Sequence, residues 1–271
     1  MPTVDLDLRQ LADAARQLRA PEPREFLREL GAGAAATAVM VILAEDVLAD
    51  LGGKPRPITE YDWTKHHYGY AVDTRKCIGC GRCVLACKTE NNVPDGCYRT
   101  WVERYHVLAD GRVEIDSPNG GANGFREREG KDEVVKAFFV PKLCNHCAKT
   151  PCTQVCPVGA SFRTPDGVVL VDGERCIGCG YCIQACPYGS RFLDPVLKIA
   201  SKCTFCYHRV TRGLLTACGQ ACPVGARIVG DFRDENSVLH RIVRDERVRV
   251  LKPELNTEPQ IYYLGLDGVV V

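Results

Sequence analysis

Sixteen of the seventeen cysteines fall into four motifs, and the spacing within them limits what the chain can fold into more than any other feature. Two motifs separate their cysteines by two, two and three residues, and the other two lengthen the middle gap to four or to eleven residues. No motif lacks a cysteine, so all four are expected to serve the same chemistry. In chain order the motifs are Cys77, Cys80, Cys83 and Cys87; Cys144, Cys147, Cys152 and Cys156; Cys176, Cys179, Cys182 and Cys186; and Cys203, Cys206, Cys218 and Cys222.

Disulfides, zinc sites and iron–sulfur clusters all use several cysteines, and the spacing decides among them. Zinc sites usually place two pairs of cysteines on either side of a longer spacer. Disulfides need no regular spacing, and thiols this close in sequence do not easily bridge within one loop. Cysteines at i, i+3, i+6 and i+10 match the bacterial ferredoxin pattern, in which three cysteines bind one cluster and the fourth binds a neighbouring one. Sixteen cysteines at four per cubane predict four 4Fe–4S clusters, whose motifs exchange fourth ligands in pairs that the spacing alone does not identify.

The residues around the cysteines fit a loop that folds closely around a cluster. Glycines at 79, 81, 178 and 180 allow the backbone to approach the cluster and to aim its amides at the sulfurs. The fourth cysteine of each motif is expected at the start of a short helix that faces a second cluster. A proline follows this cysteine in three motifs and suits the first helical turn, whereas Lys88 takes its place in the first motif.

The remaining composition excludes several other classes of protein. The 271 residues carry a net charge of +1, whereas nucleic-acid-binding domains usually have a basic excess, so no nucleic-acid partner is expected. The longest apolar run, residues 31–44, is shorter than the roughly 18 residues that a membrane span needs. Membrane contact is therefore expected only through a partner. The sequence shows no nucleophile motif, phosphate loop or paired acids, which predicts a non-catalytic subunit.

Residues 1–60 are predicted to form an N-terminal extension that ends in a Pro- and Gly-rich linker. The extension resembles a degenerate twin-arginine export signal, in which Pro23 stands where the first arginine belongs. Four residues match the core of that signal: Arg24, Phe26, Leu27 and Arg28. The apolar run that follows suits the hydrophobic region of a signal peptide. An ordinary helix in a cytoplasmic extension is the alternative interpretation.

The chain from Tyr61 onward divides into a cysteine-bearing part and a tail without cysteine. Residues 61–240 are predicted to form the four-cluster domain, and residues 241–271 a C-terminal tail that docks a partner. The polar, glycine-rich stretch 110–131 is predicted to be a loop. Strands are predicted at 98–107, 134–140, 168–171 and 261–264.

The motifs and their flanking residues resemble the four-cluster electron-transfer subunit, known as the B subunit, of the dimethyl sulfoxide and polysulfide reductase family of complex iron–sulfur molybdoenzymes. The resemblance covers roughly residues 61–265. Beyond the cysteines it rests on Cys-Ile-Gly-Cys-Gly-Arg-Cys at 77–83, Cys-Pro-Tyr-Gly-Ser-Arg-Phe at 186–192, Lys-Cys-Thr-Phe-Cys at 202–206, Cys-Pro-Val-Gly-Ala-Arg at 222–227 and Leu-Lys-Pro-Glu-Leu at 251–255. It implies an α+β fold of two nested bacterial-ferredoxin-like dicluster modules, with loop insertions, extended termini and an inner module at about 140–200.

The resemblance also implies how the motifs exchange ligands, because it pairs the first motif with the fourth and the second with the third. The implied ligand sets are Cys77, Cys80, Cys83 and Cys222; Cys203, Cys206, Cys218 and Cys87; Cys144, Cys147, Cys152 and Cys186; and Cys176, Cys179, Cys182 and Cys156.

The same resemblance implies the function of an electron relay. Four 4Fe–4S clusters would connect a molybdopterin-dependent catalytic subunit to an integral membrane quinone-interacting subunit. The chain would be a peripheral subunit at the membrane, on its periplasmic, outer face. Three alternatives stay open: the same relay in a hydrogenase or quinol-oxidising complex, a free-standing polyferredoxin, and a zinc scaffold without a redox role.

Basic residues gather around the motifs and are expected to offset the negative charge of the clusters. They are Arg75, Lys76, Arg82, Lys88, Lys142, Lys149, Arg175, Lys202, Arg209 and Arg212. A solvated basic surface is the alternative for each of them. His146 and His208 lie in or beside motifs whose cysteine sets are already complete, so packing or hydrogen bonding is expected of both. Cys97, the one cysteine outside the motifs, is expected to be buried and inert.

Overall fold

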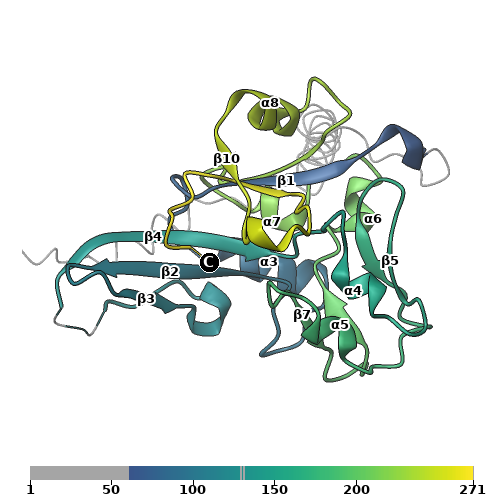
Figure 1. Ribbon diagram of the computed structural model, residues 1–271, viewed down its shortest axis with the longest axis horizontal. Coiled ribbons are helices and arrows are strands. Elements are labelled where there is room, and N and C mark those ends of the chain that lie inside the picture. The colour runs from purple at the N-terminus through teal and green to yellow at the C-terminus, as the bar shows by residue number, and fades with distance from the viewer. Residues whose placement is uncertain (1–60, 129, 131, 271) are drawn as a thin grey trace, which may run out of the picture. The chain divides into compact units, whose positions relative to one another are not determined.

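The computed structural model describes residues 61–270 apart from 129 and 131, and these residues form a mixed arrangement of short helices and strands (Figure 1). The predicted export signal and linker lie outside the described residues. Within the described part of the chain, no helix combines the length and the apolar character that a membrane span requires.

A four-stranded sheet joins the two ends of the described chain. Its strand order is β10-β11-β1-β9, with β1 parallel to β11 and antiparallel to β9. The strands are β1 (Tyr68–Asp73), β9 (Arg227–Asp231), β10 (Val248–Arg249) and β11 (Ile261–Leu264). The strand predicted at 261–264 is therefore confirmed, and the segment 241–271 supplies two strands to the sheet. Every residue of β1 is buried. Helix α8 (Val238–Asp245) packs its Leu239 against Ala71, whereas Tyr68, Tyr70 and Val72 belong to the main apolar core.

A second sheet has the strand order β3-β2-β4 and extends to the left in Figure 1. Its long strands β2 (Thr100–Leu108) and β4 (Val134–Leu143) confirm the strands predicted at 98–107 and 134–140. The loop predicted at 110–131 is only partly a loop, because it contains strand β3 (Val113–Asp116) and the 3-10 helix η3 (Pro118–Gly121). Asp110-Gly111 closes a hairpin in which the Leu108 N–H donates to the Arg112 carbonyl at 2.9 Å. An Asp-Gly pair between alternating residues is a hairpin signal that the sequence prediction overlooked.

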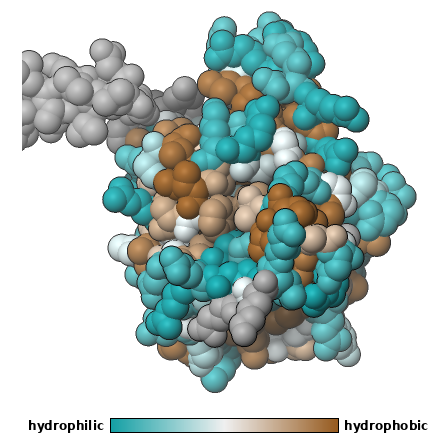
Figure 2. Space-filling model, turned by 90° about the vertical axis from the view of Figure 1, so that its left-hand side faces the viewer, coloured by the Kyte–Doolittle hydropathy of each residue, from teal (hydrophilic) through white to brown (hydrophobic). Residues whose placement is uncertain are grey.

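The surface at the free end of this second sheet is seen in Figure 2. It is largely hydrophilic, with separate hydrophobic patches. Ile115 of β3 and Val134 and Val135 of β4 are among the exposed apolar residues of the two outer strands. Exposed apolar residues scattered in this way are normal for a protein surface.

Two short hairpins lie beside the cysteine motifs in the middle of the chain, at the lower right of Figure 1. Strand β5 (Ser161–Arg163) pairs with β6 (Val169–Val171), and β7 (Arg191–Leu193) pairs with β8 (Ala200–Lys202). Strand β6 confirms the strand predicted at 168–171.

The short helices carry the third cysteine of each motif, so the prediction that the fourth cysteine begins a helix was wrong. The helices are α3 (Arg82–Glu90), α4 (Pro151–Gln154), α5 (Tyr181–Gln184) and α7 (Ala217–Gln220), with α6 (Tyr207–Val210) inside the long gap of the last motif. Helix α3 lies against α7, and α4 lies against α5. Two further 3-10 helices are η2 (Trp63–Lys65) and η4 (Pro253–Leu255).

A turn after the fourth cysteine explains this shift in three of the motifs. The N–H of Gly159 donates to the Cys156 carbonyl at 3.3 Å, and the same contact joins Gly189 to Cys186 at 3.4 Å. The N–H of Gly225 likewise donates to the Cys222 carbonyl at 3.3 Å. Proline at the second position of such a β-turn is favoured because its φ is already fixed near the required value. The Cys-Pro-x-Gly sequence thus ends the helical segment rather than starting one.

Candidate metal centres

Three cavities are each lined by four cysteines, three from one motif and the fourth cysteine of another. The first is lined by Cys77, Cys80, Cys83 and Cys222, the second by Cys203, Cys206, Cys218 and Cys87, and the third by Cys144, Cys147, Cys152 and Cys186. Four sulfur donors around one space are the donor set that a 4Fe–4S cluster takes.

The remaining cysteines of the motifs are only partly brought together. Cys182 is buried next to Cys152, and the partly buried Cys176 packs against the same group of side chains. Cys156 follows α4, which lies against the helix that carries Cys182. Cys179 is exposed. The cysteines of this set thus show the same range of burial as Cys77, Cys80, Cys83 and Cys222, which line the first cavity.

None of the seventeen cysteines, all of which lie in the described part of the chain, forms a disulfide, and most of those in the cavities are buried. Burial raises the pKa of the Cys77 and Cys152 thiols to about 11 and that of the Cys87 and Cys147 thiols to about 12. Metal binding requires the thiolate, so iron must displace a proton from each of these side chains. Within the described residues, no three His, Cys, Asp or Glu side chains converge on a position for a single metal ion.

Backbone amides point at several of the sulfurs. The Ala226 N–H donates to Cys222 Sγ at 3.2 Å, and the Phe205 N–H donates to Cys203 Sγ at 3.4 Å. Comparable bonds reach Cys176 and Cys156 from the amides of Ala200 and Ser161. Donors that point at sulfur favour the thiolate and help to hold a ligand in its binding orientation.

Two buried arginines line the cavities, and the sequence analysis did not single them out. Arg227 lines the cavity of Cys222, and Arg191 lines the cavity of Cys186. Each arginine is only 4% exposed. Both stand five residues after the fourth cysteine of a motif, in the shared sequence Cys-Pro-x-Gly-x-Arg, which is the signal that could have found them.

Most of the basic residues that the sequence analysis did name are at the surface. Arg82 and Arg212 are exposed, and the side chains of Arg75, Lys76, Lys149 and Arg175 are more than half exposed. Lys88 and Arg209 are partly buried. Lys142 and Lys202 are buried. Water screens the exposed charges, so the buried cations act more strongly on anything bound in the cavities.

His146 lies in the second motif and is fully buried. Its Nδ1 accepts a hydrogen bond from the Val169 N–H at 3.0 Å, and its ring stacks on Phe205 with the ring centres 3.7 Å apart. Burial, with the nearby Lys202 and Arg191, holds its pKa well below the usual value, so the ring is neutral. His146 lines the third cavity and Phe205 the second, so this stack connects the two.

His208 and Cys97, which the sequence analysis also singled out, lie nearer the surface than His146. His208 Nε2 contacts the Glu90 carboxylate at 2.7 Å, and its side chain is half exposed. Cys97 was predicted to be buried, but it is partly exposed, because it lies in the turn between α3 and β2. Its carbonyl accepts a hydrogen bond from Lys88 Nζ at 3.1 Å.

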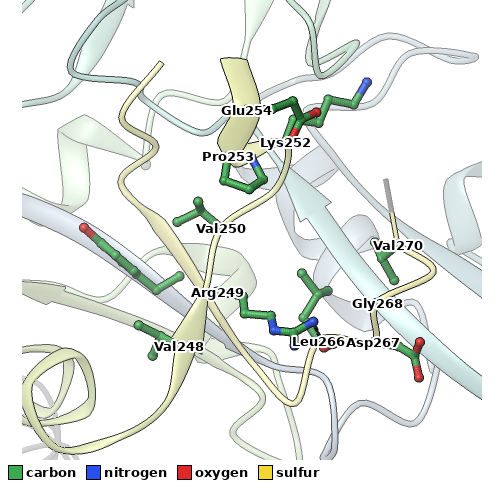
Figure 3. A pocket seen from close by; sticks show the side chains of 11 residues that line it. Val248, Arg249, Val250, Lys252, Pro253, Glu254, Leu266, Asp267, Gly268 and Val270 are labelled. Carbon is green, nitrogen blue, oxygen red and sulfur yellow. Dashed lines mark hydrogen bonds between the residues drawn. The ribbon is translucent and has the colours of Figure 1, made fainter. Parts of the chain in front are cut away.

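A further pocket of about 590 Å³ lies away from the cysteines, and Figure 3 shows the side chains that line it. They come from β10, from the segment around η4 and from the turn after β11, and every one of them belongs to residues 241–271. Arg249 and Asp267 both reach this pocket in the close view.

The fold and the four-cysteine cavities define an iron–sulfur protein. Two family models, both described as a 4Fe-4S dicluster domain, match residues 76–160 and 135–232. The chain thus contains two ferredoxin-like dicluster domains within a mixed helix and strand fold.

Relatives cover nearly the whole chain. The B subunit of the tetrathionate reductase of Salmonella typhimurium is 42% identical over 250 residues, which are 92% of this chain and 90% of the relative. The B subunit of the tetrathionate reductase of Archaeoglobus fulgidus is 45% identical over 202 residues, 74% of this chain and 84% of the relative. The Hdr-like menaquinol oxidoreductase iron-sulfur subunit 1 of the same organism is 33% identical over 287 residues, 90% of this chain and 98% of the relative.

The chain belongs to the family of iron–sulfur electron-transfer subunits, the B subunits, of the molybdoenzyme reductases. The resemblance found in the sequence is therefore confirmed.

Proposed function

We propose that this chain relays electrons through four 4Fe–4S clusters between a molybdopterin-dependent catalytic subunit and an integral membrane quinone-interacting subunit. The observation that carries the proposal is the grouping of cysteines, three from one motif and one from another, around three separate cavities. The names of the relatives support the assembly, since they are B subunits of tetrathionate reductases. In this assembly the chain itself is non-catalytic.

The proposed ligand sets are those that line the three cavities, together with Cys176, Cys179, Cys182 and Cys156 for the fourth cluster. The burial of Cys182 next to Cys152 and the contact between α4 and α5 support the fourth set.

Strand and helix pairing supports the nested arrangement of the two modules. Strand β1 leads into the first motif and pairs with β9, which follows the fourth motif. Helix α3 of the first motif lies against α7 of the fourth, and α4 of the second lies against α5 of the third. We therefore take the inner module as residues 140–200 and the outer module as the other described residues of the four-cluster domain, 61–240, with the segment 241–271 completing its sheet.

The residues of the chain itself bind the clusters, shield them from water and orient their sulfur ligands. The 4Fe–4S clusters that the thiolates would hold would supply one-electron redox chemistry. The thiolates hold the iron, the buried side chains around three cavities exclude water, and backbone amides fix the sulfurs of Cys222 and Cys203. Hydrogen bonds to sulfur and burial are among the factors that set cluster potentials.

The segment 241–271 is proposed to dock a partner subunit. The pocket of about 590 Å³ that this segment forms by itself supports the proposal, because it offers a partner a concave surface next to the four-stranded sheet. The chain is proposed to act as a peripheral subunit on the periplasmic face of the membrane, which it contacts only through its partner.

A quinol-oxidising complex is the second candidate for the assembly. It is favoured by the menaquinol oxidoreductase subunit, which covers 90% of this chain. Purification under gentle detergent conditions distinguishes the two, since a molybdopterin-containing subunit should accompany the chain in the first case and be absent in the second. A chain that purifies alone as a soluble monomer would argue against both assemblies.

The cluster count is tested by iron and acid-labile sulfide assays on anaerobically purified protein. About sixteen of each per chain are expected, four per cubane. Cys97→Ser is the matched control and should leave both counts unchanged. A folded protein without iron would overturn the proposal.

The ligand exchange is tested by EPR of single serine variants. Cys80→Ser and Cys222→Ser should perturb the same cluster signal, and Cys206→Ser and Cys87→Ser should share another. If Cys222→Ser instead perturbs the signal that Cys179→Ser perturbs, the fourth motif pairs with the third and the nested arrangement is wrong.

A further inference from the structure

The two buried arginines occupy matching places in the two modules. Arg191 is the first residue of β7, and Arg227 is the first residue of β9. One nitrogen of each guanidinium donates to a hydroxyl at the first residue of another strand. Arg191 Nη2 reaches Ser161 Oγ of β5 at 2.7 Å, and Arg227 Nη2 reaches Thr100 Oγ1 of β2 at 2.8 Å. Each arginine thus links the strand that follows one motif of a module to the strand that follows the other.

The rest of each guanidinium has no acceptor. The Nε and Nη1 atoms of Arg191 and Arg227 are buried and find no hydrogen-bond partner among the described residues. A buried cation that is not compensated is strongly unfavourable, so an anion is expected on the side where these donors are free. Both side chains line four-cysteine cavities, which is where such an anion would lie.

Cysteines from both ligand sets of a module affect the pKa of the buried arginine in that module. Burial alone would lower the pKa of the Arg191 guanidinium, but Cys152, Cys144 and Cys182 together raise it. The first two belong to one proposed set and Cys182 to the other.

The pKa of Arg227 follows the same rule in the outer module. Burial opposes its charge, but Cys83, Cys218 and Cys77, with Tyr70, raise the pKa well above the usual value. Cys77 and Cys83 belong to one proposed set and Cys218 to the other.

The contacts place each guanidinium next to two sites. Arg191 lines the third cavity, and Ser161, which accepts its hydrogen bond, donates its backbone N–H to Cys156 Sγ of the other set. Arg227 lines the first cavity, and Thr100, which accepts its hydrogen bond, lines the second.

We propose that Arg191 and Arg227 are shared counter-ions, each of which raises the reduction potentials of both clusters in its module. The inference rests on the proposed ligand sets. A cubane held by four thiolates is anionic, and reduction adds one more negative charge. A fixed cation that water cannot screen therefore favours the reduced state of whichever neighbouring cluster holds the electron.

The test is a potentiometric titration, followed by EPR, of the intact complex carrying Arg227→Met or Arg191→Met. At a fixed potential, the reduced-to-oxidised ratio of both clusters in the altered module should fall about tenfold, which is a midpoint lower by about 59 mV for one electron. The two clusters of the other module should keep their midpoints. Arg227→Lys and Arg191→Lys retain the charge and should restore most of the loss.

Two exposed arginines next to cysteines serve as matched controls. Arg82→Met in the outer module and Arg175→Met in the inner module remove a charge beside Cys83 and Cys176, yet water screens both side chains, so their midpoints should shift far less. Equal shifts in the buried and exposed variants, or unchanged midpoints in the buried variants, would overturn the proposal.

The iron and sulfide counts separate this proposal from the cluster assignment itself. A variant with a full count and an unchanged midpoint overturns the role of the arginines but leaves the four clusters standing. If Arg227→Met fails to assemble, Arg227→Gln keeps a donor for Thr100 and should show lower midpoints than Arg227→Lys. Loss of clusters in all three variants would also overturn the proposal, because a residue that only tunes potentials is dispensable for assembly.

Discussion

The inner and outer modules hold their cysteines in similar loops, but they are stabilised in different ways. The largest apolar core lies mainly in the outer module, where Tyr70, Ile261 and Tyr263 are fully buried. A minority of its buried members come from the inner module: Val140, Leu143, Cys144 and Val168. The inner module has two hairpins of three-residue strands and a small packed group in which Cys152 and Cys182 are themselves half of the buried members. Apolar burial can support the outer module, whereas the inner module depends on what its cysteines bind.

Removal of iron by a chelator is expected to have the largest effect, and it should separate the two modules. The inner module should lose its amide hydrogen-exchange protection throughout residues 144–200, because little apolar surface is buried there without the clusters. Strands β1, β9 and β11 should keep most of theirs. Hydrogen-exchange mass spectrometry measures the protection of both modules. An equal loss of protection in the two would contradict the idea that they are stabilised in different ways.

Two equivalent glycines test how tightly each motif is enclosed. Both adopt a positive φ, +70° at Gly81 and +80° at Gly180. A Cβ at Gly81 would lie 2.1 Å from the Gly121 carbonyl oxygen, whereas one at Gly180 would meet nothing within 4 Å. Gly180→Ala should therefore cost about 1–2 kcal/mol for the backbone conformation alone, and Gly81→Ala about 4 kcal/mol. The apparent melting temperature, followed by cluster absorbance, ranks the two variants, and similar decreases in both would show that η3, which contains Gly121, moves aside easily.

Two lysines beside motifs compare a buried ion pair with an exposed one. Lys142 Nζ lies 2.7 Å from the Glu103 carboxylate with both side chains less than 20% exposed, while Lys149 and Glu258 are more than half exposed. Lys142→Met should cost about 3 kcal/mol because it leaves a buried carboxylate unpaired. Lys149→Met should cost less than about 1 kcal/mol. Thermal unfolding of the two variants is the measurement.

The ion pair of Lys142 and Glu103 predicts that the stability of the protein depends on pH. Burial raises the pKa of Glu103, but hydrogen bonds from Lys142 and Trp101 outweigh it and hold the pKa below the usual value. The stability that this carboxylate contributes is present above its unfolded pKa and is lost as the pH falls through its folded pKa. In Lys142→Met only the hydrogen bonds from Trp101 and Tyr105 still oppose burial, so the carboxyl takes up a proton more readily. The difference in stability between the variant and the parent should shrink as the pH is lowered, and a constant difference would contradict the role of Glu103.

Single tyrosine hydroxyls give the smallest expected effects. Tyr188 of the inner module contacts Thr257 Oγ1 at 2.5 Å, and Tyr263 of β11 donates to the Pro141 carbonyl at 3.3 Å. Replacement of either by phenylalanine should cost about 1 kcal/mol. Both bonds join the inner module to the segment 241–271. Tyr188→Phe should therefore speed hydrogen exchange around Tyr188 and Thr257, and Tyr263→Phe should speed it around Tyr263 and Pro141; faster exchange away from these contacts would contradict a local effect.

Local patterns in the sequence were enough to place the motifs and four strands, because cysteine spacing and strand alternation are local features. Contacts between distant residues were not readable in the same way. The pairing of β1 with β11 joins Tyr70 to Ile261, and no local pattern near Tyr70 marks its partner. The shared sequence Cys-Pro-x-Gly-x-Arg marks Arg191 and Arg227 as a pair, but their burial depends on distant contacts with Ser161 and Thr100, which no local pattern identifies.

The helices were misplaced for a different, local reason. Proline after a cysteine is compatible with a first helical turn and with a β-turn, and the deciding residue was the glycine two positions later. Gly159, Gly189 and Gly225 each accept a positive φ and close the turn.

Strand β11 lies between β10 and β1, so residues 261–264 complete a sheet that begins at Tyr68. During synthesis, β1 and the first motif leave the ribosome long before this partner strand exists. Until residues 261–264 have been synthesised, the sheet beside the first motif therefore has one edge open, even though every cysteine of the four motifs has already been made.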